Sequence, residues 1–174
     1  KDTIEGWSDA VGVLIGAYLK CDLFPEYSGR KVEFDYSQIR PAGAELSSSG
    51  GKAPGPKPLK KALKKIEEIL ESAQNNQERL TPIQCYDIVM HAADSVISGG
   101  VRRSATICMF SPDDDEMMSA KTGNWFYENP QRGRSNNSVV ILRDKCKEQQ
   151  FVDIVSKIKE FGEPGFVLVD DLES

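Results

Sequence analysis

The stretch VVILRDKCKEQQFVDIVSKIKEFGEPGFVLV, residues 139–169, decides the fold class. Its first four residues form an uninterrupted apolar run, which is typical of a buried strand. A helix is predicted next, from an N-cap at Asp144 through Phe161, because apolar residues recur at helical spacing. The turn at 162–165 then leads into a second apolar strand at 166–169. The residues predicted on one helical face are Phe151, Ile154, Val155, Ile158 and Phe161.

The segments before this stretch extend the alternation of helix and strand. Thr81-Pro82-Ile83-Gln84 predicts a helix start, with Thr81 as N-cap and a glutamine three residues on. We expect this helix to end near Ile97, a buried strand at 104–110 and a short helix opened by the acidic run 113–116. Strands separated by helices favour parallel pairing. Residues 122–138 are predicted to be mostly loop. The predicted buried residues of the long helix are Tyr86, Val89, Met90, Ala93 and Val96.

The N-terminal half is predicted to be mainly helical. Apolar residues at helical spacing predict helices over 3–20 and 58–74, and alternation over 32–36 predicts a strand or an extended segment. The second helix carries lysine pairs at 60–61 and 64–65. These pairs form either a solvated face or a phosphate-facing patch.

Composition limits the class of protein. The chain has 174 residues and a formal net charge of −5, which argues against broad binding of nucleic-acid polymers. No apolar run reaches the ~20 residues that a membrane-spanning helix needs. Four dispersed cysteines and one histidine, His91, give no zinc pattern, so we expect no metal, with the cysteines as reduced, buried thiols. The run 113–116 is interpreted as a helix cap rather than a magnesium site.

Three polar segments are candidates for function. Residues 40–56 combine glycines with Arg40 and Lys52, residues 98–104 place two arginines beside a glycine pair, and residues 132–138 are crowded with amides and hydroxyls. Glycine lets a ligand approach the main chain, and guanidinium groups recognise phosphate or base edges. Each segment also has a plain interpretation as a flexible loop, a helix end or a turn.

The order of several motifs resembles that of ribonucleotide reductase catalytic subunits. Gly99-Gly100-Val101-Arg102-Arg103-Ser104-Ala105 and Ile39-Arg40-Pro41-Ala42-Gly43 carry the resemblance. Three further motifs occur in the order found in that family: Glu5-Gly6-Trp7, Asn136-Asn137-Ser138-Val139 and Gly162-Glu163-Pro164-Gly165. The double arginine and the Asn-Asn-Ser pattern are similar to the adenosylcobalamin-dependent class, including versions carried by phages of cyanobacteria.

The resemblance implies an α/β fold, part of a ten-stranded α/β barrel built from two half-sheets. Residues 1–174 would be a single internal fragment of the catalytic barrel domain. The sequence begins with Lys1 rather than methionine, which suggests that it is a piece of a longer chain. Residues 1–80 would supply the effector-site helices, 3–20 and 58–74, and the first specificity loop. Residues 81–174 would supply the second specificity loop and barrel strands.

The resemblance also implies roles for single residues. Those of the first specificity loop, near a bound deoxynucleotide effector, are Arg40, Gly43, Ser49, Gly50, Gly51 and Lys52. Those of the second, which relays the effector's identity to the substrate base, are Gly99, Gly100, Val101, Arg102, Arg103 and Ser104. Asn136, Asn137 and Ser138 are expected to face the substrate.

The family's radical cysteine follows an Asn-Pro pair, but Asn129-Pro130 is followed here by Gln131, so no catalytic residue is expected in the chain. The resemblance implies reduction of ribonucleotides by thiyl radical chemistry, with adenosylcobalamin in the full enzyme. The fragment alone is expected to be inactive. The expected partners are ribonucleotide, a dNTP effector, the C-terminal remainder and a second copy in a homodimer. The expected location is the cytoplasm, or that of an infected host cell. The alternative is a standalone α/β nucleotide-binding module.

Overall fold

The computed structural model describes residues 1–19, 22–46, 51–76, 79–96 and 105–171. The chain forms two compact units, Lys1–Ser104 and Ala105–Ser174. The first is helical and the second is α/β, so the predicted α/β class is confirmed for the chain as a whole.

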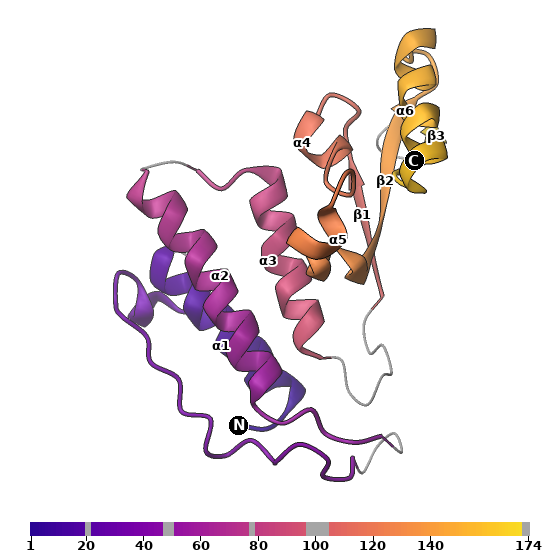
Figure 1. The fold of residues 1–174 in the computed structure, drawn as a ribbon. Coiled ribbons are helices and arrows are strands. Elements are labelled where there is room, and N and C mark those ends of the chain that lie inside the picture. Colours follow the sequence, from indigo (N-terminus) through magenta and orange to yellow (C-terminus); the bar gives the residue numbers. More distant parts are fainter. Residues whose placement is uncertain (20–21, 47–50, 77–78, 97–104, 172–174) are drawn as a thin grey trace. The chain divides into compact units, whose positions relative to one another are not determined.

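Three helices build the first unit, α1 (Ile4–Tyr18), α2 (Lys57–Asn75) and α3 (Pro82–Ser95), together with the short 3-10 helix η1 (Pro25–Tyr27). Figure 1 shows α2 alongside α1 and α3, and it packs against both. Its apolar stripe faces inward because residues three and four apart share one side of a helix. The buried core residues are Leu14, Leu59, Leu63, Ile66, Leu70 and Ile88.

Local chemistry sets where these helices start. The Thr3 hydroxyl accepts a hydrogen bond from the Gly6 N–H at 3.0 Å, which caps α1. At α3 the predicted capping box is present, with Thr81 and Gln84 each bonding the other's backbone. Both helices therefore begin where the sequence predicts.

A tyrosine joins α1 to α2. The Tyr18 hydroxyl donates to the carboxylates of Glu71 at 3.2 Å and Glu67 at 3.4 Å. Burial and these two carboxylates raise the pKa of Tyr18 to about 12. The lysines of the two pairs at 60–61 and 64–65 are exposed on the opposite side of α2, as a solvated face requires.

In the described residues between η1 and α2, no regular strand is present. Residues 32–36 are extended but unpaired within the described residues, so the extended alternative holds and the strand does not. Beyond them the chain forms a narrow loop. The Gly43 N–H donates to the Ala53 carbonyl at 2.9 Å, and the Leu46 N–H donates to the Gly51 carbonyl at 2.9 Å.

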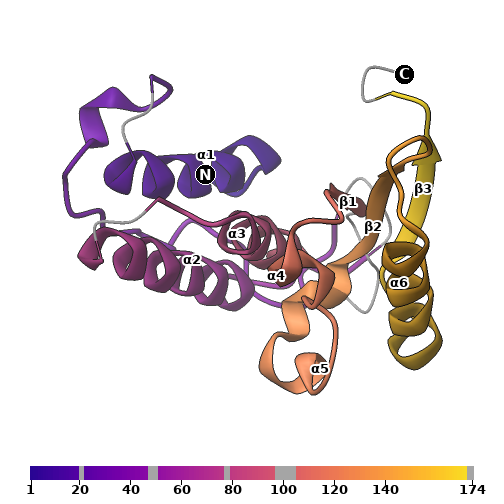
Figure 2. The same cartoon turned by 90° about the horizontal axis from the view of Figure 1, so that it is seen from above.

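A parallel sheet organises the second unit, in the order β1 (Thr106–Phe110), β2 (Ser135–Leu142), β3 (Gly165–Val169). Between β1 and β2 lie α4 (Asp115–Met118), α5 (Trp125–Glu128) and the 3-10 helix η2 (Pro130–Arg134), and α6 (Glu148–Phe161) links β2 to β3. Figure 2 shows α6 beside β2 and β3. The core formed there contains Met118, Val139, Ile141 and Ile154. The predicted parallel pairing is confirmed.

The opposite face of this sheet is open. Ile107 and Met109 of β1 are 67% and 57% exposed, and they share a face with Asn136 and Ser138 of β2 because side chains alternate along strands. Parallel sheets in folded proteins normally have both faces covered. The sheet therefore lacks a cover on one side within the part of the chain that is described.

Several predictions need correction. Residues 122–138 were expected to be mostly loop, but they contain α5, η2 and the first half of β2. The helix expected to be capped by Asp144 is capped at Lys147. Val89 is 53% exposed rather than buried. The described strands form one sheet of three, and a ten-stranded barrel is not seen. Among the described helices, none is long and apolar enough to cross a membrane.

Candidate functional site

A cavity of about 740 Å³ in the first unit is lined in part by residues of the first candidate segment, 40–56. Its walls come from one side of α1, from Leu23 and Phe24, and from the end of α3. The irregular segment contributes Ile39, Arg40, Leu46, Ala53, Pro54 and Gly55. Most of its lining is apolar, including Trp7, Leu46 and Pro54, and Arg40 supplies a guanidinium group. Mostly apolar cavities with a few placed polar groups are typical of small-molecule sites.

Arg40 is held at this cavity by Asp2. Its Nε donates to the Asp2 carboxylate, its backbone N–H donates to the same carboxylate at 3.2 Å, and its Nη2 donates to the Asp2 carbonyl at 3.3 Å. Burial alone would raise the pKa of Asp2, but the hydrogen bonds and charge of Arg40 outweigh it and lower that pKa. The Arg40 side chain remains 39% exposed, so it is both fixed and accessible.

The other first-loop candidates lie along the narrow loop. Gly43 has a φ of +87°, a left-handed conformation that favours glycine, and Lys52 is exposed. Gly51 contributes its carbonyl to the loop's hydrogen bonds. Ser49 and Gly50 lie outside the described residues.

Gly55 on the cavity wall is expected to tolerate no side chain. Its φ is +73°, and a Cβ there would lie 2.8 Å from the Ala42 backbone nitrogen. We expect Gly55→Ala to lower the free energy of unfolding by about 2 kcal/mol, from left-handed strain plus the clash. The measurement is urea unfolding followed by Trp7 fluorescence in a Trp125→Phe background, since these are the chain's two tryptophans.

Gly43→Ala is the matched control, because its φ is also positive but nothing lies within 4 Å of the added Cβ. It should cost about 1 kcal/mol, from backbone strain alone. Equal losses in the two variants would show that the approach of Gly55 to Ala42 contributes nothing.

All six second-loop candidates, Gly99 through Ser104, lie outside the described residues. The structure does show the helix that leads to them. Ala92 and Ser95 of the last turn of α3 and its C-cap residue Val96 line the cavity, and the Ser95 hydroxyl donates to the Ala92 carbonyl at 2.6 Å. Val96, the last described residue before 97–104, therefore lies in the wall of the cavity.

The third candidate segment is split between two faces of β2. Asn136 is exposed and Ser138 is partly exposed, both on the open face of the sheet. Asn137 is only 3% exposed and lies on the other face, where its Oδ1 accepts a hydrogen bond from the Ser135 hydroxyl at 2.8 Å. Asn136 and Ser138 are thus available to a ligand, whereas Asn137 is enclosed within the second unit.

A charge pair between a buried lysine and a partly buried glutamate lies beside Asn137, and the sequence did not predict it. The Lys121 ammonium, with its side chain 4% exposed, donates to the Glu163 carboxylate at 2.9 Å and to the Ser135 carbonyl. The other oxygen of Glu163 accepts the Asn137 N–H at 3.2 Å. Glu163 belongs to the Gly162-Glu163-Pro164-Gly165 motif. The residues next to Lys121 in the sequence give no sign that the Lys121 side chain is buried.

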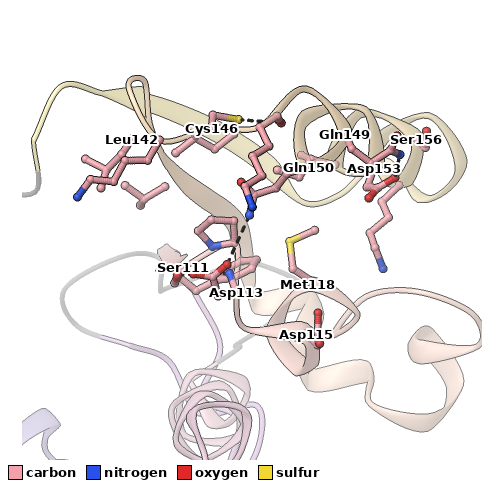
Figure 3. A pocket seen from close by; sticks show the side chains of 18 of the residues that line it. Ser111, Asp113, Asp115, Met118, Leu142, Cys146, Gln149, Gln150, Asp153 and Ser156 are labelled. Atoms are coloured by element: carbon pink, nitrogen blue, oxygen red, sulfur yellow. Dashed lines mark hydrogen bonds between the residues drawn. The ribbon is translucent and has the colours of Figure 1, made fainter.

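A second cavity, of about 1110 Å³, opens in the second unit at the carboxyl ends of β1 and β2. Ligands of open α/β sheets bind at such ends. Figure 3 shows Asp113 and Gln150 facing each other across it, with a 3.5 Å hydrogen bond between them, and Cys146 nearby. Its charges are mixed, with Asp113, Asp115 and Asp153 set among lysines of the 145–157 region.

Neither cavity presents an evident reactive group. Within the described ranges, no three His, Cys, Asp or Glu side chains are grouped so as to hold a metal ion. The described cysteines are free, but Cys85 is exposed, so its prediction as a buried thiol is wrong. Burial raises the pKa of Cys108, which disfavours the reactive thiolate.

Comparisons with known proteins identify relatives. A family model described as the insertion domain of B12-dependent ribonucleotide reductase matches residues 1–70. The adenosylcobalamin-dependent ribonucleoside-triphosphate reductase of Lactobacillus delbrueckii subsp. bulgaricus is 36% identical over 169 residues, covering 97% of this chain and 22% of the relative. The enzyme of the same name from Levilactobacillus brevis is 35% identical over 167 residues, covering 95% of the chain and 21% of the relative. No solved structure matches significantly.

The chain spans about a fifth of the length of the curated relatives it matches, and the match runs through nearly all of its own residues in both units. The ordered motifs, the near-complete alignment and the family match at residues 1–70 agree. The chain belongs to the adenosylcobalamin-dependent ribonucleotide reductase family.

Proposed function

We propose that this chain acts as part of a ribonucleotide reductase that converts ribonucleotides to deoxyribonucleotides by thiyl radical chemistry. It would supply the loops that sense an effector and face the substrate, not the radical cysteine. The observation that carries the proposal is the alignment of 97% of the chain with ribonucleoside-triphosphate reductases. Their name favours a triphosphate substrate. No observation favours the alternative of a standalone nucleotide-binding module.

The cavity of the first unit is the proposed effector site. Arg40 is fixed there by Asp2 yet remains accessible, as an arginine that binds a nucleotide phosphate requires. Because α3 forms part of the wall and leads to residues 97–104, a bound deoxynucleotide could bias the second specificity loop directly. Such coupling would be the allosteric control that balances deoxynucleotide supply for DNA replication. A homodimer of the full enzyme is part of this proposal.

The three-stranded sheet is the proposed start of a larger barrel. Parallel sheets normally have both faces covered, whereas Ile107 and Met109 are exposed here. Additional strands and a covering segment from the rest of the enzyme would bury this apolar face. Asn136 and Ser138, which share the face, would then lie within the barrel, where substrate is expected.

Adenosylcobalamin is proposed as the cofactor of the full enzyme, in which it would supply the initiating radical. No described residue can be assigned to that cofactor from its contacts. The chain's single histidine, His91, lies on α3 and lines neither of the cavities described above. We therefore assign no cofactor contact to this chain.

A chimera tests the proposed function. The matching segment of the Lactobacillus delbrueckii reductase is replaced by residues 1–174, and reduction of ribonucleoside triphosphates is assayed with adenosylcobalamin. We expect the chimera to form deoxynucleotides and the isolated chain to form none. The proposal fails if a folded chimera, verified by circular dichroism, is inactive while the unmodified relative is active. Activity of the isolated chain would refute the assignment of the radical cysteine to another part of the enzyme.

A further inference from the structure

The buried ammonium of Lys121 lies between the candidate segment 132–138 and the Gly162-Glu163-Pro164-Gly165 motif. It bonds the Ser135 carbonyl at the start of β2 and the Glu163 carboxylate just before β3. It also lies 5.5 Å from the centre of the Trp125 ring, a favourable cation–π distance. One side chain thus joins α5, β2 and the turn into β3.

Glu163 also bonds to β2, the strand that contains Asn136 and Ser138. One carboxylate oxygen accepts from Lys121 and the other accepts the Asn137 N–H at 3.2 Å. Two residues later, Gly165 pairs with Ser138, and a Cβ at Gly165 would lie 3.3 Å from the Ser138 hydroxyl oxygen. The ion pair therefore connects the amino end of β2 to the turn that leads into β3.

We propose that Lys121 is a positioning residue: with Glu163 it holds the amino ends of β2 and β3 so that Asn136 and Ser138 present their side chains to substrate. This rests on the proposed function. Lys121 lies on the covered side of the sheet with Asn137, whereas Asn136 and Ser138 lie on the open side. It therefore acts through the backbone and makes no contact with substrate.

The effect on stability distinguishes a positioning role of Lys121 from a purely stabilising one. A buried ion pair often contributes no more stability than well-packed neutral groups of similar size, because desolvation offsets the attraction. Replacing both partners by near-isosteric neutral residues should therefore leave the fold intact. What such a change removes is the directional bonding of one ammonium to both the Ser135 carbonyl and Glu163.

The double variant Lys121→Met/Glu163→Gln is the test, and the exposed Lys159→Met is the matched control. In the chimeric reductase we expect the double variant to raise KM for ribonucleotide about tenfold, with kcat and Tm close to the parent's. The single variant Lys121→Met should also lower Tm, because it leaves Glu163 unpaired. An unchanged KM in the folded double variant would overturn the proposal.

Amide hydrogen exchange tests the role of Lys121 without an activity assay, and so independently of the proposed function. In the 174-residue chain, amide hydrogen exchange at residues 135–138 and at Glu163, Gly165 and Phe166 should accelerate about tenfold in the double variant and not in Lys159→Met. If the unmodified chimera is folded but inactive, the proposed function fails and the exchange rates decide whether Lys121 orders these strand ends. Unchanged exchange would refute that ordering.

Discussion

Replacing Ile66 by alanine is expected to lower the free energy of unfolding of the first unit by about 3 kcal/mol. Ile66 lies at the middle of α2 and is fully buried, at 0% exposure. The substitution removes apolar contacts with the surrounding core and leaves a cavity that neighbouring side chains fill only in part. The measurement is urea unfolding in the Trp125→Phe background, where Trp7, which packs against this core, reports on the first unit alone.

Ile4→Ala is the control for this prediction. The chemical change is identical, but Ile4 is 87% exposed at the start of α1, so the expected change is within about 0.5 kcal/mol. If the two variants lose equal stability, the core assigned around α2 is wrong.

Replacing Ile154 by alanine should cost the second unit about 3 kcal/mol. Ile154 is the buried residue by which α6 packs on Val139 and Ile141 of β2, and it is 0% exposed. Trp125 reports on this unit in a Trp7→Phe background. Ile154 and Ile66 belong to different hydrophobic cores, so the Ile154→Ala loss is read from the Trp125 signal and the Ile66→Ala loss from the Trp7 signal.

Ile107→Ala provides the comparison within the second unit. Ile107 is 67% exposed on the open face of the sheet, so its loss should change the stability of the isolated chain by less than about 0.5 kcal/mol. In the chimeric reductase the same change should cost more, since the proposed barrel would cover this face. A large loss already in the isolated chain would show that the face is not open.

The helices of the first unit were predictable because their signals are local. Thr81 and Gln84 form a capping box over four consecutive residues, and the stripe that contains Leu63, Ile66 and Leu70 recurs within the helix itself. Val89 was predicted to be buried but is exposed, because an apolar residue at helical spacing is buried only where a neighbouring element covers it. Periodicity predicts a face but does not supply what packs on it.

The second unit shows where local signals stop. Four polar residues, Ser135 to Ser138, favoured a loop, yet they form the first half of β2. The strand includes them because Lys121 and Glu163 supply partners for the buried polar groups there. Polar groups enter a core when such partners are available, and composition alone does not reveal them.

By itself, the sequence determined most helices, the parallel pairing and, through the order of its motifs, the family. These properties follow from periodicity within a segment and from residue identity along the chain. Tertiary structure alone decided that Asn137 is enclosed while Asn136 and Ser138 face outward, and that Lys121 lies in the core. The reason is that Lys121 and Glu163 are 42 residues apart, and the burial of a charge depends on a partner that only folding brings near.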